Sequence, residues 1–344
     1  MFTVLPISLA ELARFESGKS KSALSRGLKG QAGVLEHHNR ITGVTPEALT
    51  NLWKNQHPEL FRPSSVIGAN LCGGSHKSST ILGLAGASYR ICGGPGGIPH
   101  IVIDGDSQAS TTINLLGETI RQEDQCVLVD YLEGRCEVKD LVREVSSAPN
   151  FWVIPSSLDN IYLDRALQKP SDLKSKMHLF FKELESHFNK KISIFIDTPP
   201  ALSGIFSSAI LAIVQSPDTD KCLVIPVRPD LTSIRGSKFI IDEVTSILST
   251  FSFNPNILRI EIVLSGLDRR QPVLASSAMK SLTSMAELQS KVSPIVLRFS
   301  SEVAKAWNNG TSIFDKNAIK SGLSSDVMDL WLYLKNFNGK AGNS

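Results

Sequence analysis

Glycines, a lysine and hydroxyl side chains follow an apolar stretch early in the chain. After Val66–Ala69 come Gly73–Gly74 and then Lys77–Ser78, which leads into an apolar, helix-like stretch. Glycines let backbone N–H groups approach an anion, and the N-terminus of a following helix adds positive potential. A lysine and a hydroxyl at this spacing contact phosphates and hold Mg²⁺. The segment therefore predicts a cradle for nucleotide phosphates, although Leu71 and His76 stand where the common form of this loop has glycines.

Carboxylates end two further apolar stretches. Residues 100–103 are followed by Asp104 and Asp106, and residues 192–196 are followed by Asp197. The carboxyl ends of strands line the ligand crevice of a parallel α/β sheet, so we expect all three segments to converge on one edge. A single aspartate at a strand end ordinarily caps a turn, but three beside a phosphate cradle favour a shared site.

These three segments resemble the sequence boxes of the ParA/MinD group of deviant-Walker ATPases. The boxes K-G-G-x-x-K-[ST]-[ST], I-D-x-D-x-Q and I-D-x-P-P correspond to residues 72–79, 103–108 and 196–200. Further similarity lies in three other stretches, residues 153–156, 223–229 and 298–314. The chain is most similar to the larger plasmid-partition ParA proteins, which carry an N-terminal DNA-binding domain.

The resemblance implies an α/β fold: a P-loop NTPase with a mostly parallel central sheet flanked by helices. It covers the chain from about Pro63 onward. We therefore expect an ATPase domain over residues 63–344 and a small helical, winged helix-turn-helix region over residues 1–62.

Roles for individual residues follow from the same resemblance. It implies that residues of the first box wrap the phosphates: Gly73, Gly74, Ser75, His76, Lys77, Ser78 and Ser79. Lys77 and Asp106 are expected to serve catalysis, Asp106 beside the attacking water. Ser78, Asp104 and Asp197 are expected to organise Mg²⁺, with Asp104 alternatively anchoring its loop. Gln108 and Thr198 are weaker candidates for γ-phosphate sensors. We expect the His76 side chain to face solvent rather than act as a base.

Cys72 departs from the family pattern. The family has a lysine here that crosses the interface of an ATP-sandwich dimer and neutralises charge on the partner's phosphates. A thiol supplies no positive charge, so either another cation substitutes, or hydrolysis is slow, or ATP binding acts as a switch. Arg228, Arg269 and Arg270 are the candidate substitutes.

The N-terminal region reads as a helix-turn-helix. Ser8 is a candidate N-cap, Ser17–Gly18 a turn, and residues 19–28 a second helix. The turn-rich residues 27–43 suggest a wing, and Thr45–Glu47 starts a third helix. Four polar side chains of the second helix suit phosphates and base edges in a major groove: Lys19, Lys21, Ser22 and Arg26. A helical cap or dimerisation arm with an ordinary solvated face is the alternative.

Composition and charge agree with this organisation. The chain has 344 residues, 42% of them hydrophobic, which suffices for a large core. Eight basic and five acidic residues precede Val66, so the small N-terminal region holds the whole net charge of +3. No apolar run approaches the ~20 residues of a membrane span, and five scattered cysteines indicate neither a disulfide framework nor a zinc site. We expect a cytoplasmic protein that does not bind membranes.

Basic residues near the C-terminus suggest a second DNA surface. Arg298, Lys305, Lys316 and Lys320 would hold DNA electrostatically without reading its sequence, although ordinary solvated helix faces are an equal alternative. The resemblance implies ATP/ADP and Mg²⁺ as cofactors, a homodimer, a centromere-binding ParB-like partner, binding to operator and non-specific DNA, and nucleoid association. A regulator with little ATPase activity and an ATPase that positions a protein cargo remain as alternatives.

Overall fold

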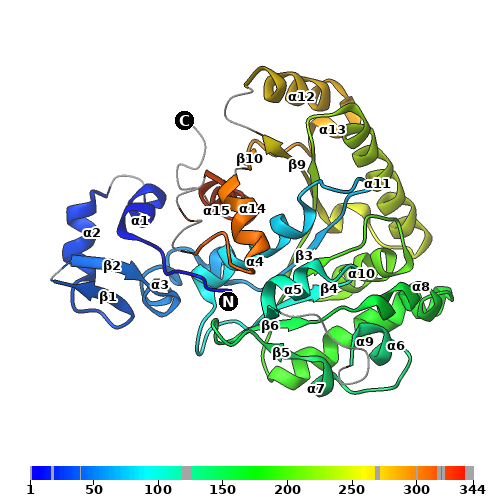
Figure 1. The fold of residues 1–344 in the computed structure, drawn as a ribbon, viewed down its shortest axis with the longest axis horizontal. Helices are drawn as coiled ribbons and strands as arrows, with labels where there is room; N and C mark the ends of the chain where they lie inside the picture. Colours follow the sequence, from blue (N-terminus) through cyan, green and yellow to red (C-terminus); the bar gives the residue numbers. More distant parts are fainter. Residues whose placement is uncertain are drawn as a thin grey trace.

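An eight-stranded sheet forms the centre of the molecule (Figure 1). The computed structural model describes residues 2–16, 19–38, 40–117, 126–267, 272–299, 301–315, 319 and 322–337. Across the sheet, the strands run in the order β10 (Leu297–Arg298), β9 (Arg259–Leu267), β8 (Asp220–Val227), β3 (Ser64–Gly68), β7 (Ser193–Asp197), β4 (His100–Asp104), β6 (Phe151–Ile154) and β5 (Arg143–Glu144). All neighbouring pairs are parallel except β5–β6. The expected mostly parallel α/β sheet is confirmed.

Alternate residues of the central strands enter two different hydrophobic cores. Ile101 and Ile103 of β4 pack into one core, whereas Val102 between them packs into the other. Successive side chains of a strand point to opposite faces, so apolar runs without polar alternation belong to strands buried on both faces. Helices must therefore cover both sides of the sheet.

Two layers of helices provide this cover. One core holds residues of α9 (Pro170–Phe188), α10 (Gly204–Gln215) and α11 (Leu231–Thr250); the other holds residues of α4 (Lys77–Cys92), α14 (Ser301–Asn308) and α15 (Gly322–Leu334). Shorter elements complete the fold: α5 (Ser110–Leu116), α6 (Leu128–Leu132), α7 (Val138–Leu141), α8 (Leu163–Ala166), α12 (Pro272–Ser284), α13 (Ala286–Gln289), η1 (Pro58–Phe61), η2 (Leu158–Tyr162) and η3 (Pro255–Ile257). Almost every residue of α4 is buried, so this helix lies in the interior of its layer.

The N-terminal elements agree with the sequence patterns. They are α1 (Leu9–Phe15), α2 (Lys21–Leu28), the antiparallel strands β1 (Val34–His37) and β2 (Arg40–Val44), and α3 (Pro46–Trp53). Ser8 caps α1 as expected, because its side chain accepts from the Glu11 N–H while Glu11 accepts from the Ser8 N–H. The expected turn at 17–18 lies outside the described residues. Three helices and an antiparallel pair of strands are therefore present, while a winged helix-turn-helix and DNA binding by this region stay predictions.

The N-terminal region packs directly on the larger part of the protein. The Arg90 guanidinium, from the last turn of α4, donates to the Leu5 and Pro6 carbonyls and to both carboxylate oxygens of Glu11. Apolar side chains of α1, α2 and α3 share one core with α4 and α15. The chain is also well packed at the expected boundary between residues 62 and 63, because Ser64 and Ser65, which follow it, are buried in β3.

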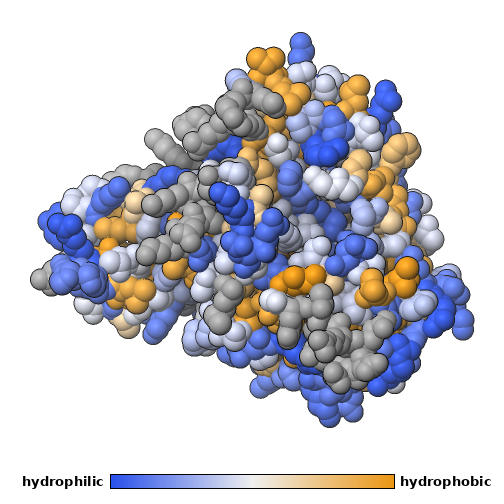
Figure 2. Space-filling view, viewed as in Figure 1, coloured by the Kyte–Doolittle hydropathy of each residue, from blue (hydrophilic) through white to orange (hydrophobic). Residues whose placement is uncertain are grey.

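Surface character differs between the ends of the molecule. In Figure 2 hydrophilic side chains cover the tip of the N-terminal region around α2, whereas apolar side chains gather over α11 and α12. No helix in the described part of the chain is long and apolar enough to cross a membrane.

Candidate nucleotide-binding site

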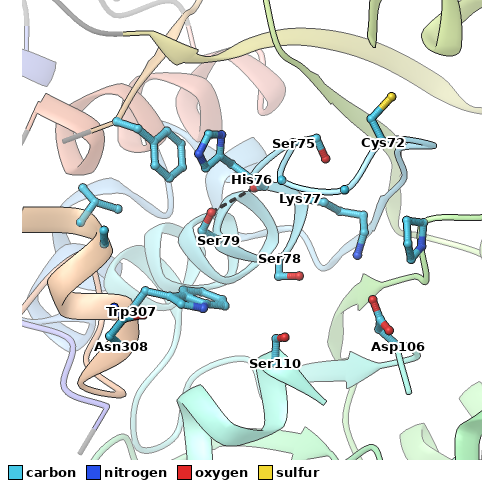
Figure 3. A pocket seen from close by; sticks show the side chains of 16 residues that line it. Cys72, Ser75, His76, Lys77, Ser78, Ser79, Asp106, Ser110, Trp307 and Asn308 are labelled. Atoms are coloured by element: carbon cyan, nitrogen blue, oxygen red, sulfur yellow. Dashed lines mark hydrogen bonds between the residues drawn. The ribbon is translucent and has the colours of Figure 1, made fainter. Parts of the chain in front are cut away.

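The glycine-containing loop leads from β3 to α4 and lines a cavity of about 360 Å³ (Figure 3). Gly73 and Gly74 are exposed at its mouth, and Gly74 has a φ of 69°, a conformation that favours glycine. Ser75 is buried, and its carbonyl accepts from the Ser265 hydroxyl. The hydrogen bond from Ser265 thus holds the loop at Ser75, while Gly73 and Gly74 line the cavity. All seven residues of the expected cradle, 73–79, line this space.

Strand register brings the motif residues together. Gly68 of β3 pairs with Asp197 of β7, and Asp197 pairs with Asp104 of β4. The Lys77 ammonium donates to Asp197 Oδ1, and the Thr111 hydroxyl donates to Asp197 Oδ2 at 2.8 Å. Lys77 is only 6% exposed and Asp197 is fully buried, so the structure holds a buried ion pair at the base of the cradle.

Asp104 and Asp106 have different surroundings. Asp104 is fully buried, and its Oδ2 accepts from the Thr112 N–H and hydroxyl at 2.8 and 2.7 Å. Burial, with the charge of Asp197 as a second cause, raises the pKa of Asp104 to about 7. Asp106 is half-buried and lines the cavity, and its carbonyl accepts from the Ser156 hydroxyl. Asp104 therefore anchors α5, while Asp106 is the carboxylate available to a ligand.

The expectation that His76 faces solvent is wrong. Its ring stacks on Phe299 with the centroids 3.7 Å apart, and it lies against Gly266, where a Cβ would come within 2.8 Å of the ring. Burial, followed by the charge of Arg228, lowers the pKa of His76. Its φ of 62° lies in the left-handed region, which costs a non-glycine residue about 1–2 kcal/mol. Aromatic packing with a distant residue offsets that cost.

Helix α14 forms a side wall of the cavity that the motifs did not predict. Val303 and Trp307 of α14 line the cavity together with Phe299 just before the helix, and Trp307 lies across the cavity from Asp106 (Figure 3). Ser110 of α5 also lines the cavity. The Asn114 side-chain amide donates to the Trp307 carbonyl at 3.1 Å, which joins α14 to α5. The resemblance covered residues 298–314, but no local signal showed that this stretch lies across the phosphate loop.

The donors at the cradle fit Mg²⁺. This ion binds oxygen and is typically held by one or two carboxylates, waters and substrate phosphates. The Ser78 hydroxyl lies in the cavity and Asp197 lies beneath it, so both would hold the ion with phosphate oxygens. Both carboxylates are hydrogen-bonded in this structure: the Asp197 oxygens accept from Lys77 and Thr111, and the Asp104 oxygens accept from Thr112 and from the Asp106 N–H.

The remaining expected site residues lie elsewhere. Thr198 donates to the Gly68 carbonyl and is buried, whereas Gln108 is exposed beside Asp106. Three expected DNA-binding residues are exposed on α2: Lys21, Ser22 and Arg26. Lys19 is exposed just before α2 and pairs with Glu16; Lys305 is exposed on α14. Arg298 is bound to Asp326, with Nε 2.8 Å from Oδ2. Arg269, Arg270, Lys316 and Lys320 lie outside the described residues.

Comparisons with known proteins agree with this geometry. A family model described as an AAA domain, AAA_31, matches residues 66–258, more than half of the chain. The cell division protein PomZ of Myxococcus xanthus is 24% identical over 247 residues, which span 71% of this chain and 70% of PomZ.

Solved structures share the fold. Apo McdA of Cyanothece has a TM-score of 0.60 and 18% identity, covering 78% of this chain and 99% of McdA. A putative plasmid partition protein of Borrelia burgdorferi bound to AMPPNP has a TM-score of 0.58 and 17% identity, covering 79% and 99%. Cobyrinic acid a,c-diamide synthase of Mycobacterium smegmatis with ADP and magnesium has a TM-score of 0.59 and 16% identity, covering 80% and 97%. The chain therefore belongs to the AAA_31 family of AAA domains.

Proposed function

We propose that this protein is a DNA-partition ATPase that hydrolyses ATP slowly. The observation that carries the proposal is the convergence of the loop 73–79, the Lys77–Asp197 pair and Asp106 on one cavity at the carboxyl edge of the sheet. Phosphate binding by the loop, metal binding beneath it and an available carboxylate opposite it are the parts that phosphoryl transfer needs.

Each residue has a role that its position supports. Backbone N–H groups of the loop and the N-terminus of α4 bind the phosphates. Lys77 moves its ammonium from Asp197 to the β- and γ-phosphates when the nucleotide enters, which frees an Asp197 oxygen. Ser78 and Asp197 would hold Mg²⁺, which when bound would neutralise charge on the phosphate oxygens. Asp106 orients the attacking water, because its side chain lines the cavity on the side to which Lys77 points (Figure 3).

DNA binding and partners complete the proposal. An ATP-bound homodimer would bind DNA non-specifically through exposed basic residues such as Lys305, and a centromere-binding ParB-like partner would stimulate hydrolysis. The winged N-terminal region would bind operator sites through α2 and repress its own operon. The exposure of Lys21, Ser22 and Arg26 supports this assignment. Such a protein would associate with the nucleoid in the cytoplasm.

Two observations favour narrower alternatives. Cys72 places no positive charge at the mouth of the loop, which favours a nucleotide-binding regulator with little turnover. The relative PomZ is a cell division protein, which favours an ATPase that positions a protein cargo rather than a plasmid.

Steady-state ATPase measurements separate the enzyme from the regulator. We expect turnover with MgATP, DNA and the partner, and a loss of at least about tenfold in Asp106→Ala, because the variant cannot orient the water. Asp242→Ala, which removes an exposed carboxylate on α11, is the control and should retain wild-type turnover. Absence of turnover above background in the native protein would reject the enzyme and leave the regulator. Footprinting on the protein's own promoter tests the operator assignment.

A further inference from the structure

The cavity holds little positive charge for a triphosphate. Among the described residues that line it, Lys77 is the only lysine or arginine, and its ammonium is bound to Asp197. A polyphosphate carries several negative charges, and P-loop proteins bind it with cations as well as backbone N–H groups.

A second cation lies against the outside of the loop. Arg228 follows the last residue of β8, and its Nη1 is 3.7 Å from the position that a Cβ on Gly74 would take. Its charge also acts on His76, two residues along the loop. The guanidinium is therefore in van der Waals reach of the glycine backbone that would wrap the phosphates.

The neighbouring residue Asp230 orients this guanidinium. Asp230 caps α11, because its Oδ1 accepts from the Ser233 N–H at 2.8 Å, and its Oδ2 accepts from Arg228 Nε at 3.1 Å. In the part of the chain that the structure describes, the side-chain hydrogen bonds of Arg228 involve Nε only, which leaves both Nη groups for a ligand. The side chain is 44% exposed.

We propose that Arg228 binds phosphate oxygens of the nucleotide held by the loop of the same chain, and supplies the positive charge that Cys72 does not provide. The planar fork of a guanidinium pairs with two phosphate oxygens at once, which suits a side chain that approaches the loop from outside. The inference rests on the proposed binding of ATP.

Calorimetric titration with MgATP tests this contact. Arg228→Gln should weaken binding about tenfold or more, because a charge-assisted hydrogen bond to phosphate is lost. Arg228→Lys keeps the charge but not the fork, so its loss should be smaller. Arg135→Gln is the matched control, since Arg135 is 51% exposed and pairs with Asp130 far from the cavity. It should bind MgATP as the native protein does.

A compensating variant tests the charge replacement itself. Cys72 lines the same cavity, so Cys72→Lys in the Arg228→Gln background should recover most of the lost affinity. Unchanged affinity in Arg228→Gln would overturn the proposed contact, and no recovery in the double variant would overturn the replacement of charge. If the native protein binds no MgATP at all, the proposed function fails first, and the two failures are thereby distinguished.

Discussion

At the scale of single residues, His76 shows how a strained position is maintained. Its left-handed backbone disfavours any residue but glycine, while its ring stacks on Phe299. We expect His76→Ala to lower the free energy of unfolding by about 1 kcal/mol, because the stacking is lost and the strain remains. His76→Gly should cost less, because glycine also removes the strain. Urea denaturation measures both, and a larger loss in the glycine variant would contradict the strain argument.

Another residue-scale prediction concerns pH. Burial lowers the pKa of His100 to about 4, and its ring nitrogens contact the Ile98 carbonyl and the Ser88 hydroxyl. The unfolded chain binds a proton near pH 6.5 while the folded protein resists it, so stability is full above pH 6.5 and falls toward pH 4. Between pH 7 and pH 5 the native protein should lose about 2 kcal/mol more than His100→Gln, at 1.4 kcal/mol per pH unit.

Comparing the native protein with His100→Gln isolates the contribution of His100 to the pH dependence of stability. The raised pKa of Asp104 acts in the opposite direction, but it is present in both proteins and cancels in the difference. His37→Gln, which changes an exposed histidine, should follow the native protein at each pH. Equal acid sensitivity of His100→Gln and the native protein would contradict the assignment of a neutral buried imidazole.

At the scale of elements, Arg90 joins α4 to α1. Its side chain is fully buried and Glu11 is its only carboxylate partner among the described residues. Glu11→Ala should lower the free energy of unfolding by about 3 kcal/mol, because a buried charge loses its counter-charge. Thermal and urea unfolding measure this cost. Glu287→Ala is the comparison, because Glu287 and its partner Lys238 are both exposed; it should cost less.

Local sequence signals predicted individual helices better than they predicted the tertiary contacts between elements. The N-cap at Ser8 and the proline at the start of α3 are signals within a few residues, and the structure confirms them. The side wall made by α14 and the stacking of Phe299 on His76 join residues more than 200 positions apart. Such contacts depend on the topology of the sheet, which motif spacing does not specify.

At the scale of the whole molecule, the strand ends made the site predictable. Three apolar segments ending in glycine or aspartate suggested one shared edge, and the order β3–β7–β4 places them side by side. The division of the chain into residues 1–62 and 63–344 stays a prediction. What spacing could not indicate is the shared core, because the packing of α3 on α4 is a tertiary contact that motif spacing does not specify.

This shared core leads to a last prediction about truncation. Removing residues 1–62 would uncover the apolar surface of α4 and α15 on which Leu49 and Trp53 now pack, and would leave the buried Arg90 without its carboxylate. We expect the truncated protein to unfold at a lower temperature or aggregate, because a newly exposed apolar patch destabilises it and promotes association. Scanning calorimetry and light scattering measure this. A truncated protein as stable as the full chain would show instead that the N-terminal region is an independent unit. DNA binding by α2 is therefore better tested with Lys21→Ala and Arg26→Ala, whose exposed side chains can be removed without disturbing the core.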